Sequence, residues 1–94
     1  MAVERADAEA AVETLVRYIE GADGTLREGL AGTPARVISA YDEIFSGYEV
    51  DVQNTLDSTF NSEGYDGIVL LRDIEFHSTC EHHMQTFSGR AHVA

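Results

Sequence analysis

The sequence predicts an α+β fold in which helices come first and an antiparallel pair of strands follows. Three observations support this prediction. Apolar residues recur at helical spacing in the N-terminal half, they alternate at strand spacing from Ile68 onward, and no strand-helix-strand repeat is present. The chain of 94 residues is long enough for one domain with a modest core.

The first expected element is a helix near the N-terminus. Its apolar residues follow one another at intervals of four, three, one and three positions, which places them on one stripe of a helix. Gly21 comes directly after the stripe region, and we expect it to end the helix. The stripe consists of Ala8, Val12, Leu15, Val16 and Ile19.

A short helical turn is expected next. Thr25 and Glu28 have the spacing of a capping box, in which each side chain accepts a hydrogen bond from a free amide at the start of a helix. Gly29 and Gly32 should keep this turn short, because glycine disfavours helix interiors.

A longer helix should begin at Thr33 and Pro34. Threonine is a favoured N-cap, and proline is favoured at the first helical position. Gly47 is expected to end this helix in the left-handed conformation. The apolar face of the helix is predicted to consist of Val37, Tyr41, Ile44 and Phe45.

The second half of the chain is expected to hold a connection and two strands. Residues 48–67 are polar and rich in turn-forming residues, and spaced apolar residues at Val52, Leu56 and Phe60 predict one short helix within them. A strand should start at Ile68 and carry Ile68, Leu70, Ile74 and Phe76 on one face. After a loop from Thr79 to Ser88, residues 89–94 should form a second strand that pairs with the first. Because the chain stops inside this strand, we expect a truncated or split gene.

Composition excludes several functional classes. The formal net charge is −11, from 17 acidic and 6 basic residues, whereas nucleic acids and anionic membranes are bound by basic surfaces. The acidic N-terminus has no signal-peptide core, and no apolar run is long enough to cross a membrane. The single cysteine excludes an internal disulfide. We therefore expect a cytoplasmic protein without nucleic-acid or membrane partners.

The strongest chemical signal lies between the two expected strands. Cys80 and His83 have C-x-x-H spacing, which lets a thiolate and an imidazole from one turn reach the same Zn²⁺. A zinc site needs at least one more protein ligand, and the other candidates in the chain are His77, Glu81, His82 and His92. The alternative is that Cys80 is a small buried residue and that the histidines are ordinary surface or core groups.

Adjacent histidines suggest a division of roles. Neighbouring side chains in an extended turn point in different directions, so one imidazole can bind the metal while the other faces a substrate. Imidazole is the usual general acid and base near neutral pH. This reasoning makes His82 a candidate for proton transfer in a hydrolytic reaction.

These residues belong to a longer pattern that resembles a known family. The segments DIEFHSTCEHHM (73–84) and GRAHVA (89–94) closely resemble the signature region of GTP cyclohydrolase I. Upstream, the segments GLAGTPARV (29–37) and DEIFSGY (42–48) are similar to the entry and exit of that family's second conserved helix. The resemblance runs from about Arg27 to the last residue.

The resemblance implies a fold, a reaction and site residues. It implies the tunnelling fold (T-fold), a homodecamer, and zinc-dependent conversion of GTP to 7,8-dihydroneopterin triphosphate and formate. It also implies that Cys80 and His83 bind zinc, that His82 is catalytic, and that Glu81 orients the ligand turn. Arg36 matches an arginine that reaches the triphosphate at a neighbouring subunit's site, although a salt bridge to a surface carboxylate is the alternative role.

Several family features are expected beyond Ala94. They are the third zinc ligand, which is a cysteine, a second catalytic histidine, the glutamate that recognises guanine, and the cluster that holds the phosphates. We therefore divide the chain into an N-terminal helix (1–24) and an incomplete GTP cyclohydrolase I domain (25–94). The isolated chain is expected to be inactive and to need its missing half or an oligomer.

Two other interpretations remain open from the sequence. The chain could be a non-catalytic zinc-binding or interaction module that docks to an intact paralogue, or an inactive remnant of the enzyme.

Overall fold

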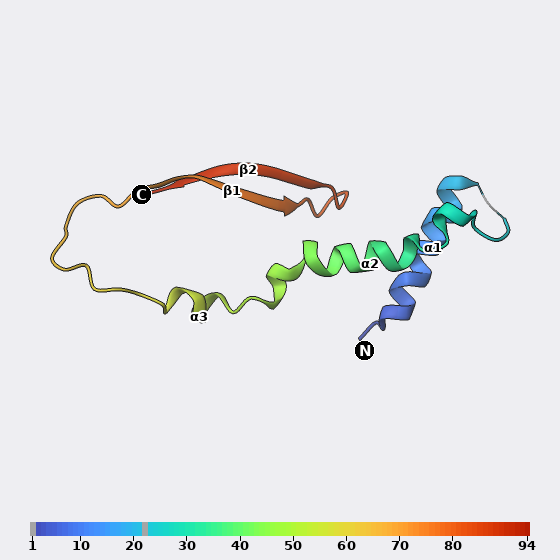
Figure 1. The fold of residues 1–94 in the computed structure, drawn as a ribbon, viewed down its shortest axis with the longest axis horizontal. Coiled ribbons are helices and arrows are strands. Elements are labelled where there is room, and N and C mark those ends of the chain that lie inside the picture. The colour runs from blue at the N-terminus through green and yellow to red at the C-terminus, as the bar shows by residue number, and fades with distance from the viewer. Residues whose placement is uncertain (1, 22) are drawn as a thin grey trace. The chain divides into compact units, whose positions relative to one another are not determined.

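The computed structural model describes residues 2–21 and 23–94, and it confirms the α+β arrangement of helices followed by an antiparallel strand pair (Figure 1). Met1 and Ala22, which belong to the predicted N-terminal segment 1–24, lie outside the described residues. The chain divides into two compact units, residues 1–48 and 49–94. In the described part of the chain, no helix combines the length and apolar character needed to cross a lipid bilayer.

Helix α1 spans Arg5–Glu20 and ends as predicted at Gly21. Gly21 has a φ of 66°, and its amide donates to the carbonyl of Tyr18, so the glycine takes the left-handed position that closes a helix. The predicted stripe is only partly covered. Its residues Ala8, Val12 and Val16 are half-buried, whereas Leu15 and Ile19 are exposed.

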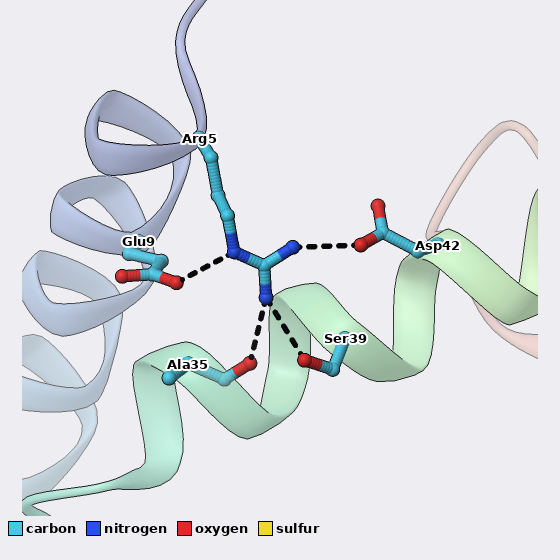
Figure 2. Close-up of polar contacts among 5 residues, drawn as sticks. All are labelled: Arg5, Glu9, Ala35, Ser39 and Asp42. Carbon is cyan, nitrogen blue, oxygen red and sulfur yellow. Dashed lines mark hydrogen bonds and ion pairs between the residues drawn. The ribbon is translucent and has the colours of Figure 1, made fainter.

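Arg5 joins α1 to the next helix, α2 (Thr33–Ile44). Its guanidinium donates to Glu9 at 3.0 Å, to Asp42 at 2.7 Å and to the Ser39 hydroxyl at 2.9 Å (Figure 2). A further bond of 3.4 Å reaches the carbonyl of Ala35. The hydrogen bond to Asp42 raises the pKa of the Arg5 guanidinium above its ordinary value, so the charge of this interhelical contact is permanent.

The short turn before α2 is the 3₁₀ helix η1 (Glu28–Leu30). Its N-cap is Arg27, and no side chain caps it, so the prediction of a capping box at Thr25 and Glu28 is wrong. The helix starts two residues later than a box with its N-cap at Thr25 requires. Leu26, inside the predicted box, is instead the buried hydrophobic residue of the described chain, with 9% of its surface exposed.

The ends of α2 differ from the prediction by small shifts. Gly32 is the N-cap and Thr33 is already helical, so Thr33 is not the cap. At the other end the cap is Phe45, and the chain continues into a second 3₁₀ helix, η2 (Ser46–Glu49). Gly47 lies inside η2 and has no positive φ, so the predicted left-handed stop is wrong.

The apolar face of α2 is largely as predicted. Val37, Tyr41 and Phe45 are half-buried, and the rings of Tyr41 and Phe45 meet edge to face with centroids 5.4 Å apart. Ile44 is exposed, and Ile38 takes its place among the half-buried residues.

The second unit contains the predicted short helix and a hairpin. Helix α3 (Val52–Leu56) is capped by Asp51, whose carboxylate accepts from the amide of Asn54 at 3.0 Å. Phe60 lies outside this helix and is 95% exposed. Strands β1 (Leu71–Thr79) and β2 (Thr86–Val93) then form a two-stranded antiparallel sheet.

Both strand boundaries differ from the prediction. Strand β1 starts at Leu71 rather than Ile68, and β2 starts at Thr86 rather than Gly89. The loop is therefore shorter than the predicted Thr79–Ser88. The polar residues Thr86 and Ser88, which resemble loop residues in sequence, are paired with Thr79 and His77 across the hairpin.

The hairpin contains one β-bulge. Between the pairs Leu71–Val93 and Ile74–Ala91, β1 has two intervening residues and β2 has one. Asp73 lies at this position with a φ of 58°. Aspartate is among the few side chains that tolerate the left-handed region, which explains how the extra residue is accommodated.

The bulge gives the hairpin an apolar and a polar face. Paired residues lie on the same face, so Leu71 shares a face with Ile74 and Phe76. The prediction that Ile68 and Leu70 share this face is wrong, because the extra residue reverses the alternation and the strand begins after them. The apolar face carries Leu71, Ile74, Phe76, Ser78, Phe87, Gly89, Ala91 and Val93, and the polar face carries Glu75, His77, Thr79, Thr86, Ser88, Arg90 and His92.

Candidate metal and catalytic turn

The candidate site residues occupy the tight turn that joins β1 to β2. The amide of Cys80 donates to the carbonyl of Gln85 at 2.9 Å, and the amide of Met84 donates to the carbonyl of Cys80 at 2.8 Å. Met84 has a φ of 55°, a left-handed conformation that reverses the chain direction. The three residues between Cys80 and Met84 are therefore held on a loop with both ends hydrogen-bonded.

Within this turn, Cys80 is closest to the first of the two adjacent histidines. The Cys80 Sγ lies 3.6 Å from Nδ1 of His82, a distance that fits a sulfur–imidazole hydrogen bond. Cys80 is half-buried, whereas His82 and His83 are both exposed. The structure thus brings Cys80 together with His82, and among the described residues no hydrogen bond joins Cys80 to His83.

Glu81 is exposed between them. Among residues 2–21 and 23–94, its carboxylate accepts no hydrogen bond from a backbone or side-chain donor and forms no ion pair. The proposed orienting role of this carboxylate therefore has no partner within the described turn.

The two other candidate histidines lie on the polar face of the hairpin, as their predicted strand positions imply. Nε2 of His77 is 3.4 Å from a carboxylate oxygen of Glu75 on the same strand. Nδ1 of His92 accepts a hydrogen bond of 3.0 Å from the backbone amide of Asp73. Each of these imidazoles thus already has a local partner.

Arg36 lies on α2, in the first unit, and folds back over the start of its helix. Its guanidinium donates to the hydroxyl of Thr33 at 3.1 Å and to the carbonyl of Gly29 at 3.4 Å. A Cβ on Gly32 would come within 2.5 Å of the guanidinium, so a larger residue there would displace the Arg36 side chain from this position. None of the ion pairs among the described residues includes Arg36, so the expected alternative, a surface salt bridge, is absent from that part of the chain.

The donor atoms of the turn suit zinc, because thiolate and imidazole are its preferred protein ligands. In the part of the chain that the structure describes, no three His, Cys, Asp or Glu side chains gather closely enough to hold a metal ion. None of the candidates His77, Glu81, His82 and His92 therefore joins Cys80 and His83 in a three-donor site here. The turn has the chemistry of part of a zinc site.

Sequence reasoning missed a hydrogen bond that joins the two strands at the bulge. The amide-to-imidazole bond between Asp73 and His92 joins residues 19 positions apart, and no local pattern predicts it. The sequence did contain one signal for the bulge. Asp73 interrupts an apolar strand pattern, and aspartate tolerates a positive φ.

Helices followed by an antiparallel hairpin that presents a cysteine and two adjacent histidines define an α+β protein with a partial thiolate–imidazole site. A family model described as GTP cyclohydrolase I matches residues 8–94. This chain belongs to the GTP cyclohydrolase I family.

Curated relatives agree with this assignment. A protein named GTP cyclohydrolase 1 from Allorhizobium ampelinum is 53% identical over 91 residues, which are 96% of this chain and 44% of the relative. Proteins of the same name from Sinorhizobium fredii and Brucella anthropi are 53% and 50% identical, and the matches cover 94% and 96% of this chain and 42% of each relative. The chain therefore spans less than half the length of these relatives.

Proposed function

We propose that this chain provides part of the active site of a GTP cyclohydrolase I, which hydrolyses GTP to 7,8-dihydroneopterin triphosphate and formate. The observation that carries the proposal is the Cys80–Gln85 turn, which holds one thiol and two imidazoles on a loop closed by backbone hydrogen bonds. Family membership gives these groups their chemical context. The remaining site groups come from sequence outside these 94 residues, since the chain spans 44% of its relative from A. ampelinum.

Cys80 and His83 are the proposed zinc ligands. A zinc ion bound there would supply an acidified water molecule for the hydrolysis. The half-buried thiol and the hydrogen-bonded amide of Cys80 favour this assignment, because a ligand needs a fixed backbone and a partly dry environment. The proposed role of Glu81 is to orient the turn once the site is complete.

His82 is the proposed acid and base. An exposed imidazole next to the metal ligands is placed to exchange protons with the guanine imidazole ring of a bound GTP. The 3.6 Å contact between His82 and Cys80 raises a specific alternative, in which His82 binds the metal and His83 moves the proton.

Arg36 is proposed to bind the triphosphate. Its guanidinium donates only to neutral oxygens of Thr33 and Gly29 among the described residues, so its charge is uncompensated by a carboxylate there. An arginine in this state binds a phosphate more strongly than one already paired, because no ion pair has to be broken.

The tunnelling fold and an oligomer complete this proposal. The apolar face of the hairpin is exposed, with Phe76 and Phe87 at 40% and 49%, and a two-stranded sheet alone is marginally stable in water. Further strands and subunits of a T-fold homodecamer, or the remaining half of the enzyme, are the proposed cover for that face. We place this assembly in the cytoplasm, without nucleic-acid or membrane partners.

A second candidate function is a non-catalytic module that docks to an intact paralogue. The exposed apolar face and the coverage of less than half of each relative both favour it, because the hairpin offers a pairing surface without a complete site.

A chimera tests the roles of the two histidines. In it, the matched 91 residues of the A. ampelinum relative are replaced by the corresponding residues of this chain. His82→Asn is expected to abolish turnover of GTP while zinc content, measured by atomic absorption, stays at the level of the unmodified chimera. His83→Asn is expected to remove both. Loss of zinc in His82→Asn with zinc retained in His83→Asn would reverse the two roles.

The same chimera tests Arg36. Arg36→Met is expected to raise KM for GTP at least tenfold, since each lost charge-assisted contact costs about 1.5–3 kcal/mol. Arg27→Gln is the matched control, because Arg27 is an exposed arginine of the same unit that already pairs with Glu20 at 2.7 Å. An unchanged KM in Arg36→Met would refute the triphosphate role.

A further inference from the structure

The β-bulge of the hairpin is closed by a side chain of the opposite strand. The amide of Asp73 donates to Nδ1 of His92 at 3.0 Å. Asp73 lies at the register shift of β1 with a φ of 58°, and His92 is the single residue of β2 opposite the bulge. A bulged residue has no regular ladder partner, and the imidazole supplies the acceptor instead.

This bond fixes the chemical state of His92. A backbone amide is always a donor, so Nδ1 must carry a lone pair, and the proton of the neutral ring must be on Nε2. A second proton on the ring would turn Nδ1 into a donor and remove the acceptor. The closed bulge therefore requires a neutral His92 in the Nε2–H form.

The bulge determines which way the following residues face. It reverses the alternation of β1, so that Glu75, His77 and Thr79 fall on the polar face and Ile74 and Phe76 on the apolar face. Without the extra residue, a regular strand would place Leu71 opposite in face to Ile74. The orientation of the strand that leads into the Cys80–Gln85 turn depends on the bulge.

We infer that His92 is a pH-sensitive positioning residue, whose neutral imidazole locks the Asp73 bulge and thereby the register of the hairpin. The consequence for catalysis rests on the proposed function, because only then does the orientation of the turn matter to a reaction. The lock itself is a property of this hairpin and is independent of any activity.

The charged positions near His92 by register come from both strands. On β1 the nearest charged positions by register are Arg72, Asp73 and Glu75, and on β2 Arg90 lies two residues away on the same face. Two of these positions are basic and two are acidic, and the hydrogen bond from Asp73 is the directional contact that the structure gives the ring.

Nuclear magnetic resonance of the ¹⁵N-labelled chain tests the lock. At pH 8 we expect the ring nitrogens of His92 to show the Nε2–H tautomer and the Asp73 amide to be protected from exchange. At pH 5, where histidine side chains ordinarily gain a proton, the protection factor of Asp73 should fall roughly two- to tenfold relative to that of Phe76. An Nδ1–H tautomer at pH 8 would overturn the inference.

Two variants separate the acceptor from the rest of the imidazole. His92→Ala should lower the protection factor of Asp73 at pH 8 as acidification does, because no acceptor remains. His92→Asn restores an acceptor oxygen near the place of Nδ1 and cannot be protonated in this range, so it should keep Asp73 protected at both pH values. His77→Asn is the matched control on the same face, with protection at Asp73 unchanged. Equal protection of Asp73 in the native chain and in His92→Ala would refute the lock.

Discussion

The two units of this chain differ in which apolar residues they bury and in the contacts that join their elements. In residues 1–48, the helices contact each other directly, Leu26 is buried, and the Arg5 guanidinium bonds to four groups on α1 and α2. In residues 49–94, the hairpin carries the candidate chemistry, yet its apolar face is exposed. The helical unit buries Leu26 and joins its helices through Arg5, whereas no residue of the hairpin is buried and its side chains Leu71, Phe76, Phe87 and Val93 are all exposed.

The proposed site is also incomplete within the part of the chain that the structure describes. Catalytic and binding residues concentrate on loops that a rigid scaffold positions, and here the scaffold is a single hairpin. The local hydrogen bonds of the turn hold the backbone of Cys80, whereas the proposed third ligand and the proposed cover of the apolar face are non-local. The backbone of the turn can therefore be ordered although the proposed metal site lacks a ligand. Each of these two properties can be tested.

The largest effect is expected from the proposed zinc ligand Cys80. Cys80→Ser in the chimera should lower zinc affinity at least about 100-fold, because even partners of metal ligands contribute 10- to 100-fold. Competition with a chromogenic chelator measures this affinity. Ser78→Ala, two residues earlier on the apolar face, is the control and should leave zinc affinity unchanged. Equal affinities of the Cys80→Ser and native chimeras would remove Cys80 from the site.

A smaller effect is expected where the hairpin packs on itself. The ring of Phe76 lies over Gly89, and a Cβ at residue 89 would come within 2.6 Å of the ring. Gly89→Ala should therefore displace Phe76 and destabilise the hairpin by about 1 kcal/mol, at the low end for overpacking because the ring can move. Urea denaturation of the chimera gives the value. Stability equal to that of the native chimera would show that Phe76 makes no essential contact there.

Replacing Met84 with glycine should stabilise the turn between the two strands. Met84 has a φ of 55°, which costs about 1–2 kcal/mol for a residue with a Cβ, and glycine relieves this at an entropic cost of about 0.5–1 kcal/mol. Met84→Gly should raise the protection of the Cys80 amide by a net of about 0.5–1 kcal/mol. Met84→Ala keeps the strain and should give no gain, and equal gains in both variants would contradict the account.

The smallest effect concerns the contact between the helices. Arg5→Gln should lower amide protection in the first turns of α1, because the bonds to Asp42 and Ser39 are lost, and added salt should reduce the difference between variant and native chain. Arg17→Gln is the matched control, since Arg17 pairs only with Glu13 of its own helix among the described ion pairs. Equal changes in both variants would mean that Arg5 does not link the helices.

Local features were predictable from sequence, and non-local ones were not. Helical periodicity identified α1 with its end at Gly21, and the short helix α3, because both depend on neighbouring residues. The capping box at Thr25 and the stop at Gly47 were wrong, since several residues can take each cap and tertiary contacts decide between them.

In the candidate site, too, local features were predictable from sequence and contacts between distant residues were not. The residue types at 80–83 predicted a zinc chemistry, which stays a prediction, and the motif predicted the family, which the comparison confirms. The shared face of Ile68, Leu70, Ile74 and Phe76 was predicted wrongly, because a regular alternation was assumed and β1 contains a bulge at Asp73. The proximity of Cys80 to His82 is a side-chain geometry that spacing alone did not predict.

Formation of neopterin from GTP tests the central claim most directly. The 94-residue chain and the chimera are each incubated with GTP and zinc, and the product is oxidised and measured by fluorescence. We predict product from the chimera and none from the chain alone, because the turn supplies only part of the site. Turnover by the chain alone would contradict the need for further residues, and an inactive chimera that folds and assembles like its parent would contradict the assignment of the turn as part of the active site.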